Sequence, residues 1–298
     1  MRFFANKRGR RGVAMRIGLV LAGGFAKGAY QVGALRALEK FVPKSDIYCI
    51  SAASIGALNA YAYATDNLNG AEKLWNEAVE HGGRRFITGL MRGNLLQENI
   101  NRLVNDAQPL SQPLYCPLLD WRTQTLAYQN LSDVKLGDLR KYLRASVALP
   151  PYNAPVTVAD VSYYDGGLVD NIPVAPLVNT ELDYVICFYF DEANYEFENA
   201  YFDNRIIKVS FASESMLSHS FVLTSEKIAD MIRVGYEFTM ERLTPFFEKG
   251  KDDLEHIYKT IEISNRRHTK PSRRLTVDVV ISNLNRLTKK LTRRKDIK

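Results

Sequence analysis

A serine in this sequence stands where its hydroxyl could act as a nucleophile. Ser54 lies between a buried strand, expected at Asp46–Ile50, and an apolar helix, expected at about Ile55–Thr65. At such a turn the hydroxyl projects from the N-terminus of a helix, where backbone N–H groups and the helix dipole favour developing negative charge. Ala52 and Gly56 keep the turn small enough for strand and helix to approach closely. The alternative is a serine that only caps the helix.

A glycine-rich turn, Ala22–Gly28, precedes the helix expected at Ala29–Phe41. Such a turn presents unpaired N–H groups and can therefore hold an anion. The dinucleotide-binding pattern fails because Phe25 occupies the place of its second glycine, and the phosphate-loop pattern G-x-x-x-x-G-K-[ST] is absent, with Ala29 following Gly28. The turn therefore suits an oxyanion, which needs only two well-aimed N–H groups.

A carboxylate supplies the third chemical group. Asp165 ends a predicted hairpin strand and is followed by Gly166 and Gly167, which let the chain turn away and leave the carboxylate projecting. Alone, this tripeptide commonly marks only a turn. A catalytic site requires the Ser54 hydroxyl and the Asp165 carboxylate to meet within a hydrogen bond, or through one intervening water, beside the glycine-rich turn, so that aspartate can accept the serine proton.

In this order, the three turns resemble the motifs of the patatin-like phospholipases. The flanking segments are also similar to that family, and Asp165–Val174 (DGGLVDNIPV) is the closest match. Strand–turn–helix occurs twice in the first 65 residues, which by itself indicates an α/β fold with parallel strands. The resemblance implies a three-layer α/β/α fold with a central, mostly parallel sheet.

The resemblance also implies roles for individual residues. Ser54 would be the nucleophile and Asp165 the sole base, a dyad without histidine that hydrolyses fatty acyl esters of phospholipids or other lipids through an acyl-enzyme. Gly23, Gly24 and the N–H of Phe25 would line the oxyanion site. The loop and its supports would comprise Gly23, Gly24, Phe25, Lys27 and Gly28, with Lys27 fixing the loop, and Gly56, Gly166 and Gly167 at the two other turns.

Two residues depart from the family pattern. Phe25 replaces a glycine, so its N–H has to point correctly without the positive φ that a bulky residue resists. Ile55, beside the serine, is larger than the residue usual there. These changes would slow the reaction, narrow the acyl pocket or mark an inactive site. The second hypothesis is therefore a catalytically impaired lipid- or partner-binding protein that keeps the fold.

A serine–aspartate–histidine triad is a competing interpretation, because His219 and His256 both follow Asp165. Each lies in a segment with helical patterning, where an exposed or capping role is expected instead. A long helix is expected at Ser213–Leu243, and its apolar stripe predicts core packing in preference to a lid. The acidic, aromatic stretch Asp191–Asn204 is expected to be a loop.

The charge of the chain gathers at its two ends. Residues 1–16 carry six Lys or Arg and no acid, and residues 266–298 carry twelve against two acids. Since the whole chain has a net charge of +7, the residues between are net acidic. Basic ends suit anionic lipid headgroups, but solvated tails that aid solubility have the same composition. No stacking motif or recognition module accompanies the charge, so no specific nucleic-acid partner is expected.

These features divide the chain into a basic leader at residues 1–15, expected to be disordered, an acyl hydrolase domain at 16–265 and a basic segment at 266–298. The leader lacks the apolar stretch of a secretory signal, and Met15 is a second candidate start. The three cysteines are few, and buried reduced thiols are expected. Neither zinc, calcium nor another cofactor is expected. Together these predict a cytoplasmic protein that meets membranes only at their surface.

Overall fold

The computed structural model describes residues 14–82, 95–104, 109–110, 112–150, 152–190, 195–197, 200–211, 224–267 and 273–275. Eight strands of this part of the chain form one sheet: β1 (Ile17–Leu21), β2 (Ile47–Ala52), β3 (Leu114–Asp120), β4 (Leu126–Asn130), β5 (Val156–Val158), β6 (Val161–Asp165), β7 (Tyr184–Tyr189) and β9 (Ile206–Ser210). Their spatial order is β5-β6-β3-β2-β1-β7-β9, with β4 paired to β3.

Parallel pairing dominates the centre of this sheet. β1 lies between β2 and β7 and is parallel to both, and the pairs β2–β3 and β7–β9 are also parallel. β4, β5 and β6 add antiparallel pairs at one end. Because β1 and β2 run the same way, the turns that follow them emerge at the same edge, and this is where ligands bind in open α/β sheets.

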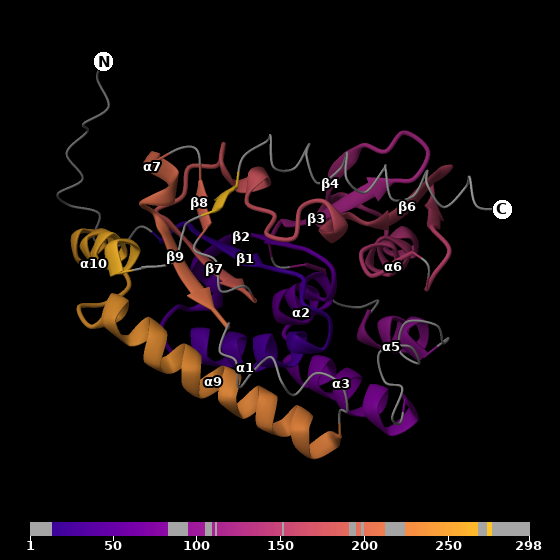
Figure 1. Ribbon diagram of the computed structural model, residues 1–298, viewed down its shortest axis with the longest axis horizontal. Coiled ribbons are helices and arrows are strands. Elements are labelled where there is room, and N and C mark those ends of the chain that lie inside the picture. Colours follow the sequence, from indigo (N-terminus) through magenta and orange to yellow (C-terminus); the bar gives the residue numbers. More distant parts are fainter. Residues whose placement is uncertain are drawn as a thin grey trace.

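Helices and one further strand pair complete the described structure: α1 (Gly28–Leu38), α2 (Ile55–Ala64), α3 (Leu68–Gly82), α5 (Leu95–Leu103), α6 (Leu136–Ala145), α7 (Ala200–Asp203), α9 (Ser225–Phe247), α10 (Leu254–Arg267), and β8 (Tyr195–Phe197) paired with β10 (Arg273–Leu275). Figure 1 shows α1, α2, α3 and α9 gathered along one face of the sheet. The fold class expected from the sequence is confirmed: a mixed sheet of mostly parallel strands flanked by helices.

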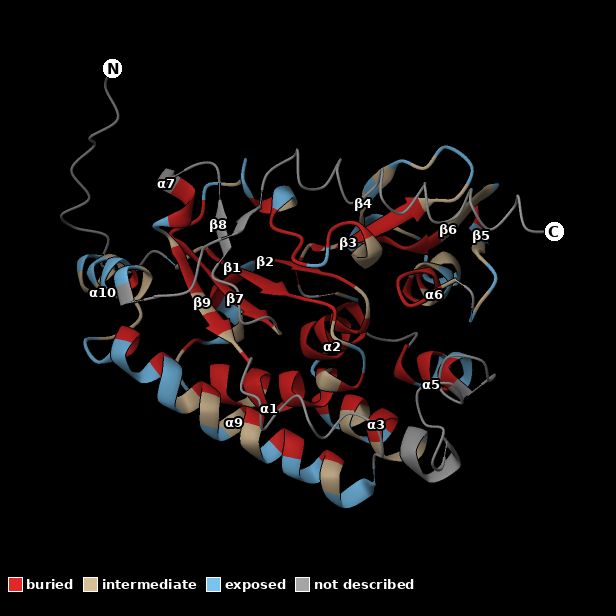
Figure 2. Cartoon of the chain, in the orientation of Figure 1, coloured by how far each residue is buried: buried red, intermediate tan, exposed pale blue. Residues whose placement is uncertain are grey.

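Two glycines allow α1 and α9 to pack at very short range. A Cβ atom at Gly33 would lie 1.9 Å from the Ile232 carbonyl oxygen, and one at Gly235 would lie 2.1 Å from the Tyr30 carbonyl oxygen. Any side chain at either position would therefore push the helices apart. In Figure 2, α1 is buried, whereas α9 has one buried face and one exposed face.

The opposite face of the sheet carries a smaller apolar cluster. Its sheet residues, which include Val20, Cys49 and Val185, are covered by the segment after β6 and by Phe202 of α7. Ile172 and Leu177 belong to that segment. An irregular segment therefore covers this face, and the same segment leads directly out of the turn that holds Asp165.

The long helix differs from its predicted bounds. α9 begins at Ser225, where the Thr224 hydroxyl oxygen accepts a hydrogen bond from the Lys227 N–H (3.2 Å), and it continues to Phe247. The start of the predicted range, with His219, lies outside the described residues. Ile228, Met231 and Ile232 are buried in the main core, so this part of the stripe packs inside the protein.

The expectation of a loop at Asp191–Asn204 is wrong for the residues that the structure describes there. β8 and α7 form within it. β8 pairs with β10, a strand far away in the sequence, and local patterning cannot reveal such a partner. The prediction for the cysteines is confirmed, since Cys49, Cys116 and Cys187 are all buried and unpaired.

Candidate active site

Ser54 lies at a strained turn between β2 and α2. Its backbone has φ 54° and ψ −133°, a conformation that L-residues rarely adopt and that strong surrounding contacts must maintain. The small neighbours explain how the turn fits, since a Cβ atom at Gly56 would lie 2.8 Å from the Leu21 carbonyl oxygen. The Ser54 side chain makes no capping hydrogen bond to α2, which excludes the alternative of a simple helix cap.

The Ser54 hydroxyl faces the Asp165 carboxyl as a hydrogen-bond partner that lowers the pKa of that carboxyl. The sheet register explains the meeting: Ser51 pairs with Tyr115, and Leu118, three residues further along β3, pairs with Asp165. Three residues beyond Ser51, just past the end of β2, the chain has reached Ser54. The two residues are far apart in sequence, yet they stand at the same level of the sheet.

Asp165 is almost fully buried, with 1% of its surface exposed. Burial raises the pKa of its carboxyl to about 7, although the hydrogen bonds from the Ser54 hydroxyl and the Gly167 N–H oppose this increase. The Gly167 bond is 2.8 Å long and reaches Oδ1. A carboxyl with a pKa near neutrality can both accept and return a proton, as a general base requires.

The two glycines after Asp165 allow the chain to pack closely against β3 and against the Asp165 carboxyl group. A Cβ atom at Gly166 would lie 2.3 Å from the Pro117 carbonyl carbon, and one at Gly167 would lie 2.9 Å from Asp165 Oδ1. Neither glycine has a positive φ. The turn therefore needs glycine for space beside β3 and beside the carboxylate, whereas the sequence suggested a need for backbone freedom.

Gly23 places the glycine-rich turn against the nucleophile. A Cβ atom at Gly23 would lie 2.7 Å from the Ser54 Cβ. However, the Gly23 N–H donates to the Asn171 carbonyl oxygen (3.2 Å), so it is not available to an oxyanion. Among the described residues of this turn, the N–H groups of Gly24, Phe25 and Ala26 have no acceptor. Of these, Gly24 and Phe25 lie next to Gly23 and are the candidate oxyanion donors.

Phe25 occupies its position with φ 50°, and its side chain is 54% exposed. The expectation that its N–H would be placed without positive φ is therefore wrong. Left-handed backbone costs an ordinary residue roughly 1–2 kcal/mol, and the turn tolerates this cost because its two ends are held by β1 and α1. The exposed ring lies at the surface and does not contribute to the core.

The rest of this turn is held by buried polar groups and by packing. Gln31 Nε2 donates to the Ala22 carbonyl oxygen (2.7 Å), and Asn59 Nδ2 donates to the Gly28 carbonyl oxygen (2.9 Å). A Cβ atom at Gly28 would lie 2.9 Å from Ile55, so the bulk of that isoleucine fills space that Gly28 leaves open. The Lys27 ammonium lies 5.8 Å from the centroid of the Phe190 ring. The loop is thus tied to α1, α2 and β7.

Of the two candidate histidines for a triad, the structure describes only His256. It lies in α10, and its Nε2 is 2.9 Å from the Pro245 carbonyl oxygen. This bond ties it to the end of α9. Among the residues that the structure describes, Ser54 is the side chain whose hydrogen bonding lowers the Asp165 pKa.

The structure adds three residues that the sequence did not single out. Asn171 clamps Gly23, because its Nδ2 donates to the Gly23 carbonyl oxygen (3.0 Å) while its own carbonyl accepts from the Gly23 N–H. Asp170 is buried and accepts a hydrogen bond from the Tyr128 hydroxyl (2.5 Å). The segment DGGLVDNIPV contains both Asp170 and Asn171, but only the tertiary structure shows that they contact β4 and the glycine-rich turn.

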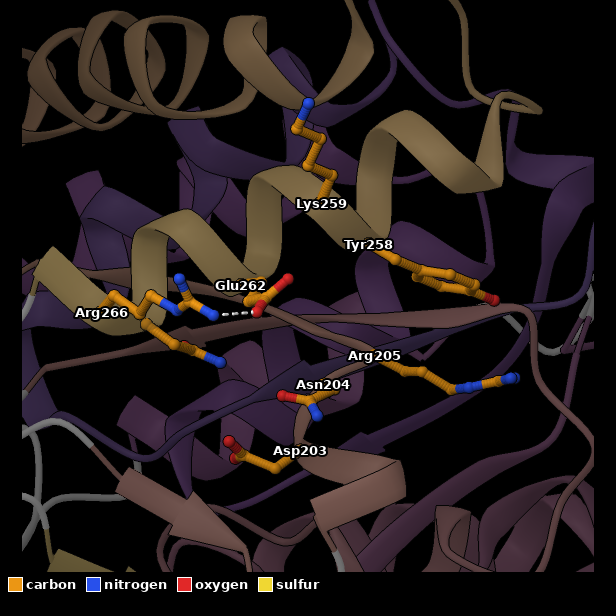
Figure 3. A pocket seen from close by; sticks show the side chains of 8 residues that line it. Asp203, Asn204, Arg205, Tyr258, Lys259, Glu262 and Arg266 are labelled. Carbon is orange, nitrogen blue, oxygen red and sulfur yellow. Dashed lines mark hydrogen bonds and ion pairs between the residues drawn. The ribbon is translucent and has the colours of Figure 1, made fainter.

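A surface pocket elsewhere holds about 670 Å³ and lies between α10 and the start of β9. Figure 3 shows its charged side chains, with Glu262 and Arg266 joined in an ion pair. The Arg205 guanidinium lies 5.1 Å from the centroid of the Tyr258 ring. None of the residues that line this pocket belongs to the predicted site.

Within the ranges given above, no cluster of three metal-ligating side chains occurs, and no helix is long and apolar enough to cross a membrane.

Comparison with known proteins identifies the family of this chain. Residues 19–178 match the family described as patatin-like phospholipase, which is more than half of the chain. The chain therefore belongs to the patatin-like phospholipase family. It is 29% identical over 183 residues to lysophospholipase nte1 of Aspergillus terreus, and 30% identical over 180 residues to a patatin-like phospholipase domain-containing protein of Caenorhabditis elegans.

These relatives are much longer proteins. The alignments cover 57% and 55% of this chain but only 11% and 13% of the two relatives. An uncharacterized NTE family protein of Mycobacterium tuberculosis is 26% identical over 188 residues, which are 61% of this chain and 51% of that protein. Among solved structures, VipD of Legionella pneumophila is similar with a TM-score of 0.48 and 13% identity, over 78% of this chain and 67% of that one.

Proposed function

We propose that this chain is a serine acyl hydrolase that cleaves fatty acyl esters of phospholipids or related lipids. Family membership and relatives named phospholipase and lysophospholipase support a lipid ester hydrolase. The observation that carries the finer proposal is that the Ser54 hydroxyl, at its strained turn, faces the buried Asp165 carboxyl, whose pKa is about 7. Ser54 is then the nucleophile and Asp165 the only base.

In the acylation step, Ser54 Oγ attacks the ester carbonyl carbon while its proton passes to the Asp165 carboxylate. The carbonyl oxygen becomes an oxyanion that the Gly24 and Phe25 N–H groups can bind, and such a donor is typically worth a hundred- to thousandfold in rate. When the tetrahedral intermediate collapses, the ester C–O bond breaks and the leaving alcohol takes the proton from Asp165. The product is an acyl-enzyme on Ser54.

In deacylation, water is the nucleophile and the Ser54 oxygen is the leaving group. Asp165 accepts a proton from water, and the hydroxide attacks the acyl carbonyl carbon. The bond between the acyl carbon and Ser54 Oγ then breaks, and Asp165 returns the proton to the serine oxygen. A fatty acid leaves, and the starting state is restored. One carboxyl group therefore serves both half-reactions, which a pKa near neutrality favours.

The test combines labelling with product analysis. The purified full chain is treated with a fluorophosphonate, and fatty acid release is measured on vesicles of mixed phospholipids. We expect Ser54 to be labelled, and both labelling and release to be lost in Ser54→Ala. Ser51→Ala is the matched control, because Ser51 lies in β2 only three residues before Ser54 and its buried hydroxyl has no partner in the described structure. A folded protein that neither labels nor releases fatty acid contradicts the proposal.

A second candidate function is a lipid- or partner-binding protein without catalysis. The strained Phe25 in the oxyanion turn is the observation that favours it. The same experiment separates the two, since a binder retains vesicle binding without labelling. His256→Ala tests the competing triad, and we expect activity to stay within a few-fold because that ring bonds the Pro245 carbonyl.

The proposal extends to location, as a cytoplasmic protein that meets anionic membranes through its basic ends. Each Lys or Arg near such a surface contributes about 1 kcal/mol, and salt screens the attraction. Sedimentation with phosphatidylserine vesicles should exceed that with phosphatidylcholine vesicles, and it should fall when residues 276–298 are deleted. Equal binding to both vesicles contradicts this part of the proposal.

A further inference from the structure

Gly23 is held by a single residue from a distant part of the chain. Asn171 accepts a hydrogen bond from the Gly23 N–H (3.2 Å), and its side-chain Nδ2 donates to the Gly23 carbonyl oxygen (3.0 Å). A Cβ atom at Gly23 would lie 2.4 Å from Asn171 Oδ1 and 2.7 Å from the Ser54 Cβ. The glycine-rich turn is therefore wedged between the nucleophile and this asparagine.

The side-chain bond determines the direction of a neighbouring amide. The Gly23 carbonyl and the Gly24 N–H belong to one peptide unit, which is planar and trans, so the two groups point in opposite directions. Because Asn171 Nδ2 holds the carbonyl, it also sets where the Gly24 N–H points. Gly24 is one of the two candidate oxyanion donors.

Asn171 is itself held in place by the residue before it. Asp170 is buried, accepts the Tyr128 hydroxyl (2.5 Å) and a hydrogen bond from the Ile172 N–H, and its own N–H donates to the Gly166 carbonyl oxygen (2.9 Å). These bonds connect Asn171 to β4 and to the turn that carries Asp165. The glycine-rich turn and the turn that carries Asp165 are therefore joined by hydrogen bonds through Asn171 and Asp170.

We propose that Asn171 is a positioning residue for acyl transfer, whose side-chain amide aims the Gly24 N–H at the oxyanion. The inference rests on the proposed function of the same site. Asn171 itself is an exposed residue, and its contribution acts through Gly23. Loss of its donor should therefore affect the chemical step much more than substrate binding or folding.

The test measures kcat and KM on a short-chain p-nitrophenyl ester at pH 8, together with the melting temperature. We expect Asn171→Ala to lower kcat by roughly 100-fold, the lower end of the loss typical of removing one oxyanion donor, with KM changed less than about threefold. Asn171→Asp has nearly the same shape but its carboxylate cannot donate, so it should lose as much kcat. Asn67→Ala is the matched control, since Asn67 Oδ1 holds a turn through the Gly70 N–H far from this site in sequence.

The outcomes separate this inference from the function on which it rests. A wild-type protein that is folded but inert overturns both. An active wild type whose Asn171→Asp variant keeps full kcat overturns only the positioning role, because shape alone would then suffice. A melting temperature that falls sharply in both variants also overturns it, because Asn171 would then stabilise the fold. A selective loss of kcat in both variants with normal melting supports it.

Discussion

Asp165 and Asp170 are carboxylates in one short segment, and their surroundings invite a comparison. Both are buried, both have a raised pKa because burial disfavours the charged form, and both accept one hydroxyl and one backbone N–H. The hydroxyl on Asp165 belongs to Ser54, at a strained turn beside a glycine loop. The hydroxyl on Asp170 belongs to Tyr128, whose pKa burial raises above its ordinary value. A buried carboxyl group can therefore have a catalytic role as a base, as proposed for Asp165, or a structural role as a hydrogen-bond acceptor, as for Asp170. The hydroxyl group that it faces determines the role.

The largest expected difference is in activity. Asp165→Asn should lower kcat/KM by about 10³–10⁴-fold, because the variant has no base for the Ser54 proton. Asp170→Asn should stay within about tenfold, because an amide oxygen can still accept from Tyr128. Ester hydrolysis by the two variants, measured side by side, checks this. Equal losses of kcat/KM in the two variants would mean that Asp165 and Asp170 do not differ in their contribution to catalysis.

The pH dependence of kcat/KM should report Asp165. Its carboxyl must be ionised to accept a proton, and its pKa is about 7. Activity should therefore fall about tenfold per pH unit below this value and level off above it. A profile from pH 5 to 9 with a soluble ester tests this expectation. A plateau extending down to pH 5 would mean that the base ionises with an ordinary carboxyl pKa.

The raised pKa of the buried Asp165 carboxyl should make the free energy of unfolding depend on pH. The folded pKa of Asp165 is about 7 and its ordinary value is 3.8, so between these pH values the folded state keeps a proton that the unfolded state has lost. The free energy of unfolding therefore falls as pH rises through this window. Asp165→Asn removes the effect and should be more stable by about 2–4 kcal/mol at pH 8. Urea unfolding at pH 4 and pH 8 measures this, and a variant that is less stable at pH 8 contradicts it.

Removal of the Tyr128 hydroxyl tests the structural role of Asp170. Tyr128→Phe leaves the buried Asp170 carboxylate with one donor fewer and should lower the free energy of unfolding by about 1–3 kcal/mol. In an Asp170→Asn background the same change should cost less, because no buried charge loses its donor. A double-mutant cycle by urea unfolding gives the coupling, and additive effects would mean that the 2.5 Å bond contributes little.

The smallest effect concerns Phe25, at the edge of the catalytic region. Asparagine tolerates left-handed backbone better than phenylalanine, so Phe25→Asn should raise the free energy of unfolding by about 1 kcal/mol. Its N–H is retained, so fluorophosphonate labelling should remain within a few-fold. A loss of labelling would assign a role in substrate contact to the exposed ring.

Much of the site was predictable because its groups lie at turns with distinctive local chemistry. Ser54 between a strand and an apolar helix, the glycines after β1, and Asp165 before two glycines each have a local signature, and their order resembles one family. The contributions of Tyr128, Asp170 and Asn171 could not be predicted in this way. Tyrosine, aspartate and asparagine are common in any chain, and their roles depend on partners in other elements.

The same contrast between local signals and distant partners applies to the prediction of the fold. Hydrophobic runs and helical spacing identified β2, α1 and α2, because burial patterns repeat within a few residues. The strand pair β8–β10 was missed because it depends on a distant partner. The start of α9 was missed because local patterning did not reveal the cap at Thr224.

The amino-acid sequence by itself determined which residues could react and which turns could hold them, because small residues, glycines and apolar periodicity constrain the chain locally. Only the tertiary structure decided that the Ser54 hydroxyl reaches Asp165, that burial shifts that carboxyl toward neutrality, and that Asn171 holds Gly23. Hydrogen bonding and desolvation depend on distances of a few ångströms between segments, and those distances exist only after the sheet has brought the strands into register.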